Sequence, residues 1–392
     1  MKKLLIVNNN MKIGGVQKSL YNLLWSIDTV NEYDVTLLLF SKAGAYTDSL
    51  PESIRIKECK GLFRLLGRSQ SEHKSNLKDY LIRAILATAT RIFGRASVLR
   101  FLLLFEPMLD EEYDCAISFL HNGSEKSFYG GTQDYVLSRV KAEKKVAFIH
   151  GDYVKCGACC SSNNRMLGKF DAIAACSDGC RRVLTEVLPE LENKFITVRN
   201  FNRYDEIKNL SAEESVIYDS SFVNIIMVAR LSNTKGIDRA VKALAFCVKK
   251  GIRAKLHIVG GGSLKEQLET LAKNEGVGEY VLFYGEQNNP YRYMKNADML
   301  LIASYHEAAP MVIDEAFCLA LPVLSTKTTS TDEMILEPEI GWVCGNLQDA
   351  LNNKLFDAVS DREKLIFMKK KLSEKCADNT KAISQFKELI NN

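Results

Sequence analysis

The sequence predicts an α/β protein with two doubly wound parallel sheets, each in its own domain. The chain has 392 residues, about twice the length of one ordinary domain. It is 46% hydrophobic and 26% charged with only 7 prolines, a composition that excludes disordered and low-complexity classes. Short apolar runs alternate with segments of helical periodicity, and this series starts afresh in the second half.

The first half contains five apolar runs of the kind that buried parallel strands show. They are residues 4–7, 35–40, 115–120, 146–150 and 172–176. A polar loop and Gly14-Gly15 follow the first run and lead into a helical pattern from Val16 to Ile27.

The second half begins after residues 205–222, which are polar and acidic and are predicted to form a linker. Its expected strands are residues 223–228, 255–259, 281–284, 299–302 and 322–325, with helices at 237–249 and 263–274. The closing segment 362–389 is rich in lysine and helix-prone. Two such halves would face each other across a crevice at the carboxyl ends of their strands, where open α/β folds bind ligands.

Charge and cysteine usage narrow the functional class. Lys and Arg number 52 against 48 acids, so the net charge of +4 does not indicate a general polyanion binder. No run reaches about 18 apolar residues, and the apolar run 4–7 is too short for a signal-peptide core. Eleven scattered cysteines predict free thiols in a reducing compartment, hence a cytoplasmic protein. Cys156, Cys159 and Cys160 cluster, but no second paired-ligand motif follows, so no metal site is predicted.

Residues 57–105 differ from the rest of the chain. They hold ten Lys or Arg against three acids, with apolar residues interleaved among the charges. A basic amphipathic segment of this kind is typical of a surface that lies on anionic lipid. The alternative is an ordinary helical hairpin with a solvated face. Nucleic acid is not expected as a partner, because no recognised binding module accompanies the charge.

Two stretches carry groups suited to binding a phosphorylated ligand. Gly14-Gly15, between a strand and a helix, lets the backbone approach a ligand closely. Arg230 and Lys235 follow the first strand of the second half and can clamp a diphosphate. Each feature alone has an ordinary explanation, as a tight turn or as surface cations.

The strongest feature is a pair of carboxylates, Glu307 and Glu315, eight positions apart. They bracket a small-residue turn, residues 308–312, between the strand 299–302 and a helix. Carboxylates accept hydrogen bonds from sugar and ribose hydroxyls, and charges placed among apolar neighbours need partners.

At this point the chain resembles glycosyltransferase family 4, the retaining nucleotide-sugar transferases of the GT-B fold. The resemblance covers nearly the whole chain and is densest from Val223 to Thr326. The matching stretches are Gly14 to Gln17, Val228 to Leu231 with Lys235-Gly236, Ile258 to Gly262, and Glu307 to Glu315 as the E-x7-E signature.

The resemblance implies a role for each of these residues. Arg230 and Lys235 would bind the donor diphosphate, Glu315 the ribose hydroxyls, and Glu307 the transferred sugar. The amides of Ala309, Pro310, Met311 and Val312 are assigned to a cradle for sugar and phosphate, although the proline contributes no N–H. Gly14 and Gly15 would approach the diphosphate from the other domain, where His150 would contact the donor sugar.

The family pattern also implies the organisation and chemistry of the whole chain. Residues 1–204 would bind the acceptor, residues 205–375 the nucleotide-sugar, and residues 376–392 would form a helix returning to the first domain. The reaction would transfer a hexose or N-acetylhexosamine from a UDP-sugar to a glycan or lipid-linked acceptor in surface polysaccharide synthesis. No metal or other cofactor is expected. The protein would be cytoplasmic, and the basic segment 57–105, if it contacts lipid, would place it on the inner face of the cell membrane.

The sequence departs from the family pattern at Gln17, Ala308 and Phe201, which bears on the identity of the donor sugar. Two rival hypotheses remain from the residues alone. One is a nucleotide-sugar epimerase of the same fold, and the other is a non-enzymatic or NAD-binding Rossmann protein. The absence of G-x-G-x-x-G after the first strand disfavours NAD.

Overall fold

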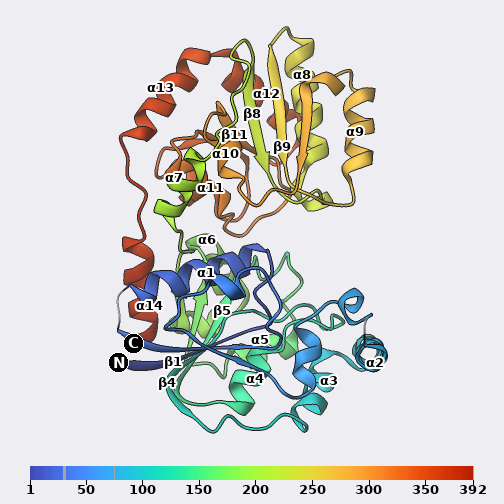
Figure 1. Cartoon of the computed structure of the whole chain (residues 1–392), viewed down its shortest axis with the longest axis vertical. Coiled ribbons are helices and arrows are strands. Elements are labelled where there is room, and N and C mark those ends of the chain that lie inside the picture. The colour runs from blue at the N-terminus through green and yellow to red at the C-terminus, as the bar shows by residue number, and fades with distance from the viewer. Residues whose placement is uncertain (30–31, 75, 392) are drawn as a thin grey trace. The chain divides into compact units, whose positions relative to one another are not determined.

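The computed structural model describes residues 1–29, 32–74 and 76–391, which form two compact units. Unit 1 comprises Met1–Phe201 and Asn379–Asn392, and unit 2 comprises Asn202–Asp378. Each unit is an α/β layer structure with a parallel sheet at its centre (Figure 1). Among the described residues, none of the helices combines the length and apolarity that crossing a bilayer requires.

Unit 1 has a seven-stranded sheet in the order β3-β2-β1-β4-β5-β6-β7. Its strands are β1 (Lys2–Asn8), β2 (Tyr33–Leu39), β3 (Arg55–Glu58), β4 (Glu112–Ser118), β5 (Lys141–Ile149), β6 (Ala172–Ala175) and β7 (Phe195–Thr197). Its helices are α1 (Gly15–Asp28), α2 (Leu77–Phe93), α3 (Arg95–Leu103), α4 (Thr132–Arg139), α5 (Ser161–Leu167), α6 (Asp178–Val187) and α14 (Thr380–Asn391). Short 3-10 turns lie at Thr47–Ser49, Leu62–Leu66, Gln70–His73 and Pro189–Lys194.

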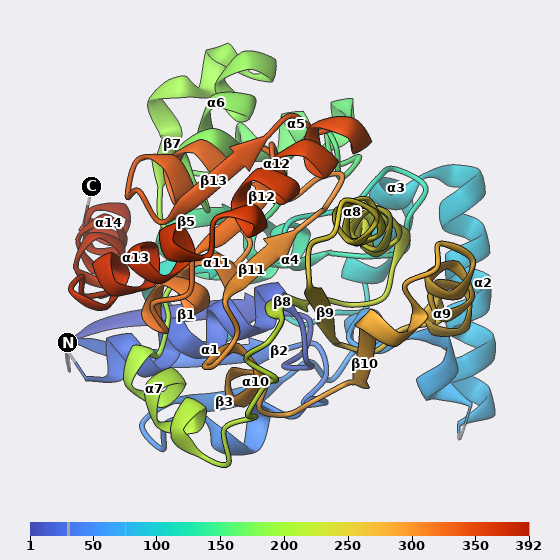
Figure 2. The same ribbon diagram turned by 90° about the horizontal axis from the view of Figure 1, so that it is seen from above.

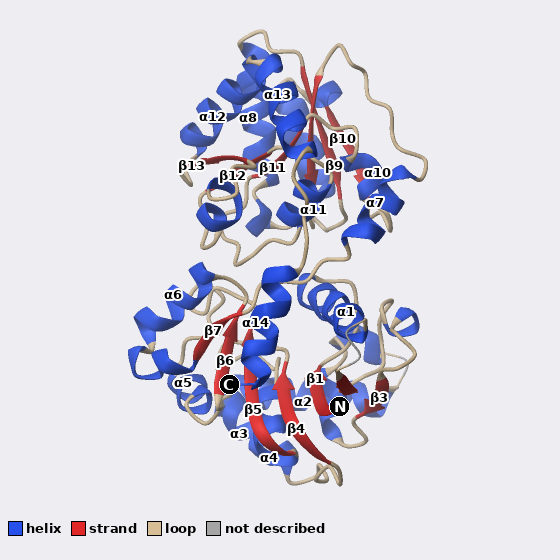
Figure 3. Ribbon diagram, turned by 90° about the vertical axis from the view of Figure 1, so that its left-hand side faces the viewer, coloured by secondary structure: helices blue, strands red, loops and turns tan. Residues whose placement is uncertain are grey.

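The last helix, α14, belongs to unit 1 together with the first part of the chain. Phe386 and Leu389 are buried in the same apolar cluster as β1 and α1. Lys144 of β5 donates to the Leu389 carbonyl over 2.7 Å. Figure 3 shows α14 lying over the strands of this sheet.

Unit 2 has a six-stranded sheet in the order β10-β9-β8-β11-β12-β13. Its strands are β8 (Val223–Val228), β9 (Ala254–Val259), β10 (Val281–Gly285), β11 (Met299–Ile302), β12 (Val323–Thr326) and β13 (Gly341–Cys344). Its helices are α7 (Tyr204–Ala212), α8 (Ile237–Lys249), α9 (Lys265–Asn274), α10 (Tyr291–Met294), α11 (Val312–Cys318), α12 (Gln348–Ser360) and α13 (Arg362–Ser373). Single turns lie at Asn233–Lys235, Gly278–Tyr280 and Asp332–Leu336.

Alternate residues of β8 enter two different cores, as the two-residue repeat of a strand requires. Ile225 and Met227 pack with α8, α9 and α12 on one face. Ile226 packs with α7, α10 and α11 on the other. Both faces are therefore covered, which explains why the central strands read as continuous apolar runs.

Two segments outside the sheets differ from the sequence predictions. Part of the predicted linker 205–222 is helical, because Ile207 of α7 is buried against α11 and β11, an anchor that the polar sequence around it conceals. The segment 362–389 is two separate helices, α13 and α14, which lie in different units.

The basic segment 57–105 is only partly an amphipathic surface. Phe63, Leu65 and Leu66 are buried in the core of unit 1. Arg95 is fully buried and pairs with Asp134 at 3.5 Å, so it belongs to the interior and not to a charged face. The outward-facing part is the α2–α3 hairpin, and Figure 2 shows α2 along its length at the margin of unit 1.

Candidate active site

The loop after β8 carries Arg230 and Lys235 of unit 2. Gly236 ends this loop with φ +62°, and a Cβ atom there would lie 2.0 Å from the Ala303 carbonyl oxygen. Only glycine accommodates both this backbone conformation and this contact. The close approach brings the start of α8 against the end of β11, so Lys235 lies beside the segment that follows β11.

Lys235 and Glu307 are in direct contact. Lys235 Nζ lies 2.5 Å from Glu307 Oε1, and the Ser304 hydroxyl donates to the same oxygen over 2.8 Å. Both charged side chains are largely covered, with 23% and 14% of their surfaces exposed. Partial removal from water strengthens such a pair relative to one on the open surface. The structure therefore brings together two predicted site residues that are 72 positions apart.

Glu315 is buried, with 4% of its surface exposed. It lies in the first turn of α11, and the Tyr291 hydroxyl donates to its Oε1 over 3.4 Å. Residues 309–311 precede α11, and Val312 is its first residue. Arg230, in contrast, is exposed at the beginning of the β8 loop.

A second arginine, Arg239, stabilises the loop that carries Glu307 and was not identified from the sequence. Arg239 of α8 is buried, donates to Asn346 Oδ1 over 2.7 Å, and lies over the Tyr305 ring at 4.6 Å. The Asn346 amide donates in turn to the Tyr305 and Lys327 carbonyls, each over 2.9 Å. This network fixes the loop that carries Glu307. The sequence signal that could have identified Arg239 is its charge within the apolar repeat of α8.

In unit 1, Gly14 and Gly15 begin α1, as the sequence predicts. Gly14 is the residue before the helix, and its carbonyl accepts the Lys18 N–H over 2.8 Å. Gly15 is exposed, and a side chain there would meet nothing within 4 Å. The first turn of α1 is thus open to the surroundings.

His150 follows β5 and sits in an aromatic environment. Its ring stacks on Phe148 at 4.8 Å and lies 4.4 Å from the Phe119 ring. Its Nε2 atom is buried without a hydrogen-bond partner among the described residues. Burial, with a smaller contribution from His121, lowers the pKa of His150 to about 3, so the imidazole is neutral near pH 7.

His121 is a neighbour that the sequence analysis did not identify. Burial lowers its pKa to about 4, and its Nε2 lies 3.6 Å from the Cys156 sulfur. Cys156 and Cys159 are exposed free thiols, as is typical of the loop predicted there. Across the described ranges, no group of three or more His, Cys, Asp or Glu side chains is placed to hold a metal ion.

Comparison with known proteins places these residues in context. Residues 213–382 match the family model of glycosyl transferases group 1. An uncharacterised glycosyltransferase of Methanocaldococcus jannaschii is 30% identical over 165 residues, 41% of this chain and 40% of that protein. The lipopolysaccharide glucosyltransferase WaaG of Escherichia coli K12 is 34% identical over 128 residues, 32% of this chain and 34% of that protein. The chain thus matches only about a third to two fifths of the length of these relatives.

Likeness at the level of the fold extends over the whole chain. The crystal structure of Anabaena HepE in complex with UDP and glucose has a TM-score of 0.68 at 16% identity, and the alignment covers all of both chains. The crystal structure of WaaG has a TM-score of 0.60 at 17% identity over 99% of this chain and 98% of that one. The chain therefore has the GT-B fold, and residues 213–382 are similar to the group 1 glycosyl transferases.

Proposed function

We propose that the protein is a retaining glycosyltransferase of family 4. It transfers a hexose or N-acetylhexosamine from a UDP-sugar to a hydroxyl of a glycan or lipid-linked acceptor. The observation that carries this proposal is the contact between Lys235 and Glu307, at the carboxyl edge of a parallel sheet and inside the segment that matches the family model. The name of WaaG and the UDP bound to HepE support the choice of a surface glycan and of this nucleotide.

In this proposal unit 2 holds the donor. Arg230 and Lys235 stabilise the negative charge that grows on the leaving diphosphate, a type of electrostatic contribution worth about 3 kcal/mol per donor group. The diphosphate competes with Glu307 for the Lys235 ammonium, which frees the Glu307 carboxylate to accept hydrogen bonds from the sugar. Glu315, fixed by Tyr291, accepts from the ribose hydroxyls.

Unit 1 supplies the acceptor side and the first turn of α1. His150 is neutral, so it can hydrogen-bond a sugar hydroxyl without adding charge beside the reacting carbon. A donor phosphate oxygen takes the acceptor proton in front-face substitution, so the reaction requires neither a protein base nor a metal. The crevice between the two sheets stays a prediction.

The first test is a screen of the purified full chain against nucleotide sugars, with and without a metal chelator. We expect slow release of UDP from one UDP-sugar, unaffected by the chelator. Conversion of that sugar to its epimer without release of UDP would contradict a transferase and support the epimerase alternative. No turnover of any nucleotide sugar, together with no binding of UDP, would overturn the proposal.

We further propose that the α2–α3 hairpin rests on an anionic membrane surface. Large apolar side chains are exposed along it at Leu77, Leu81, Ile85, Ile92, Phe93, Phe101, Leu104 and Phe105. Exposed cations accompany them at Lys74, Lys78, Arg91 and Arg100. Buried apolar area and attraction to anionic lipid act together in such helices, with about 1 kcal/mol for each cation near the surface.

Vesicle flotation tests this placement. The wild-type chain should float with phosphatidylglycerol vesicles at low salt and less so at high salt. The double variant Ile92→Ser/Phe93→Ser should lose most of this binding. Ile366→Ser/Phe367→Ser is the matched control, since these two side chains are equally exposed on α13. Flotation that is absent, or equally reduced in both variants, would remove the hairpin from the proposal.

A further inference from the structure

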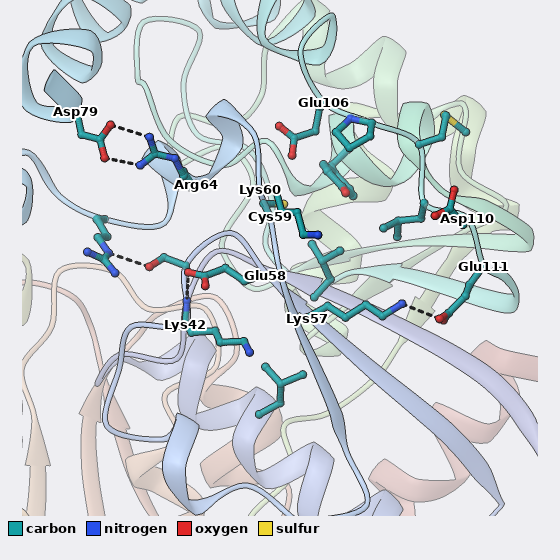
Figure 4. A pocket seen from close by; sticks show the side chains of 18 of the residues that line it. Lys42, Lys57, Glu58, Cys59, Lys60, Arg64, Asp79, Glu106, Asp110 and Glu111 are labelled. Carbon is teal, nitrogen blue, oxygen red and sulfur yellow. Dashed lines mark hydrogen bonds and ion pairs between the residues drawn. The ribbon is translucent and has the colours of Figure 1, made fainter.

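Unit 1 contains a pocket whose lining includes none of the proposed donor-binding residues. Its volume is about 970 Å³, within the size range of pockets for small molecules. The ends of β2 and β3, the segment 60–68, α2 and the segment 106–111 form its walls. Figure 4 shows its lining, in which charged side chains predominate.

The segment 60–68 is pinned to the loops that follow β1 and β2. Asn10 of the first loop donates to the Gly67 carbonyl over 2.7 Å. A Cβ atom on Gly67 would lie 2.6 Å from the backbone nitrogen of Ser41 in the second loop. Lys12, two residues before Gly14 in the sequence, pairs with Glu72 at 2.5 Å. These contacts hold the 60–68 wall of the pocket in place.

Two ion pairs account for part of the charge that lines the pocket. Lys57 pairs with Glu111 at 2.8 Å. Arg64 binds Asp79 through both guanidinium nitrogens, which is the stronger, bidentate arrangement. Figure 4 shows Lys60 between these two pairs.

Three further cations line the pocket, and among the described residues none of them forms an ion pair with an acid. Lys42 and Lys60 are exposed, and the Arg68 guanidinium donates to the Ser41 hydroxyl over 2.9 Å.

The three other acids of the lining do not neutralise these cations directly. Glu58 accepts the Lys42 backbone N–H over 2.9 Å, and Asp110 is exposed. Glu106 is buried and accepts the backbone N–H groups of Gly61 and Phe63, and burial raises its pKa. Both oxygens of Glu106 are therefore already hydrogen-bonded to the backbone.

His73 provides an independent sign of a ligand. It lines the pocket with 4% of its surface exposed, and its Nε2 has no hydrogen-bond partner within the described part of the chain. Burial lowers its pKa; the charges of Arg83, Arg68 and Arg64 act in the same direction, and that of Asp79 acts against them. Three cations and one carboxylate thus lie near the imidazole, one nitrogen of which is unsatisfied. A buried polar atom without a partner is unfavourable, and a ligand oxygen would satisfy it.

We propose that this pocket binds an anionic group, a phosphate ester or a carboxylate, carried by the acceptor. Lys42, Lys60 and Arg68 neutralise its charge, and His73 donates Nε2–H to one of its oxygens. That the anionic group is carried by the acceptor rests on the proposed function. The binding of an anion is inferred from the residues that line the pocket.

Calorimetric titration of the full chain tests the pocket with inorganic phosphate, glucuronate and, as the neutral counterpart, glucose. Phosphate and glucuronate should bind and glucose should not. Lys42→Met and Lys60→Met should each weaken anion binding about tenfold, as the loss of one charge-assisted hydrogen bond does. Lys126→Met is the matched control, because Lys126 is exposed in the same unit and lies outside the pocket.

Each outcome decides the inference. Tighter binding of glucuronate assigns the group to an acidic sugar, and tighter binding of phosphate assigns it to a phosphate ester. If phosphatidylglycerol vesicles are displaced by free phosphate, the ester belongs to a lipid headgroup. No binding of either anion, or equal effects of Lys60→Met and Lys126→Met, would overturn the inference.

Titration of the wild-type chain with UDP separates this inference from the proposed function. UDP is expected to bind unit 2. Anion binding that depends on Lys42 and Lys60 in a chain that neither binds UDP nor turns over any nucleotide sugar would refute the transferase and leave the pocket as an anion site. UDP binding without anion binding would support the proposed function and refute the anion site.

Discussion

The two units present their candidate site residues in opposite physical states. In unit 2, Lys235 and Glu307 are charged, partly covered and bonded to each other. In unit 1, His150 is neutral, stacked on an aromatic ring, and has a buried nitrogen without a partner among the described residues. The comparison teaches that stabilising a leaving diphosphate needs fixed charge, whereas an uncharged sugar needs shape and uncharged donors.

The family match follows the same division. Residues 213–382 match the group 1 model, and all but the last four of them lie in unit 2. The matched segment therefore lies almost entirely in the unit that holds Lys235 and Glu307.

The largest expected effect comes from removing the Lys235 charge. Lys235→Ala should lower turnover of the UDP-sugar about 10²–10³-fold, the size seen when one preorganised electrostatic donor is lost. Lys242→Ala is the control, because Lys242 is exposed on the adjacent α8. Steady-state release of UDP measures both variants, and unfolding curves show whether each is folded.

Glu307→Gln refines the same measurement. It keeps an oxygen that can accept from Ser304 but removes the ion pair with Lys235. We expect a fold-intact variant with strongly reduced turnover and retained UDP binding. Turnover at the wild-type rate in both Lys235→Ala and Glu307→Gln would show that the contact between the two residues is structural only.

The next effect concerns the turn that places Lys235. In Gly236→Ala, a Cβ atom would meet the Ala303 carbonyl at 2.0 Å in a left-handed backbone conformation, so the end of β11 must shift. We expect the free energy of unfolding to fall by about 2–4 kcal/mol, measured with urea. Gly251→Ala is the control. Gly251 also has a positive φ, +84°, but nothing lies within 4 Å of its Cβ position, so only about 1 kcal/mol should be lost. Equal losses of stability in the two variants would mean that the contact with Ala303 does not destabilise Gly236→Ala.

The sequence predicts the centre of each sheet and one edge strand, β10, but misses the other three edge strands. The strands 223–228 and 299–302 and the helix 237–249 have the bounds of β8, β11 and α8. The strands β3, β7 and β13, each at the edge of its sheet, were missed. Arg55–Glu58 is polar and partly exposed, so it lacks the apolar run that marks a strand covered on both faces.

The site divides in the same way. Lys235 and Glu307 follow apolar strands, so their meeting at one sheet edge could be expected from chain position alone. The neighbourhood of His150 could not, because His121 and Cys156 lie in loops whose paths depend on tertiary packing. Arg95 shows the reverse failure. Its place in a basic run indicated a surface, but Asp134 and Asn163 bind it in the interior.

The smallest expected effect tests the neutral state of His150 in unit 1. Its pKa lies below the ordinary value of about 6.5, at about 3, so the unfolded chain binds its proton first as the pH falls. The stability that the neutral imidazole contributes is therefore fully present above pH 6.5 and declines below it, by at most about 1.4 kcal/mol per pH unit for this group.

His150→Gln should make the unfolding midpoint less sensitive to pH between 6.5 and 5. The exposed His306, replaced in His306→Gln, is the control and should keep the wild-type slope. The remaining slope comes from the other groups with shifted pKa values, which include His73, His121 and His257, whose pKa values burial also lowers. A slope in His150→Gln equal to that of the wild type would mean that the imidazole takes up its proton as readily in the folded chain as in the unfolded one. The contrast between the charged pair of unit 2 and a neutral imidazole in unit 1 would then not hold.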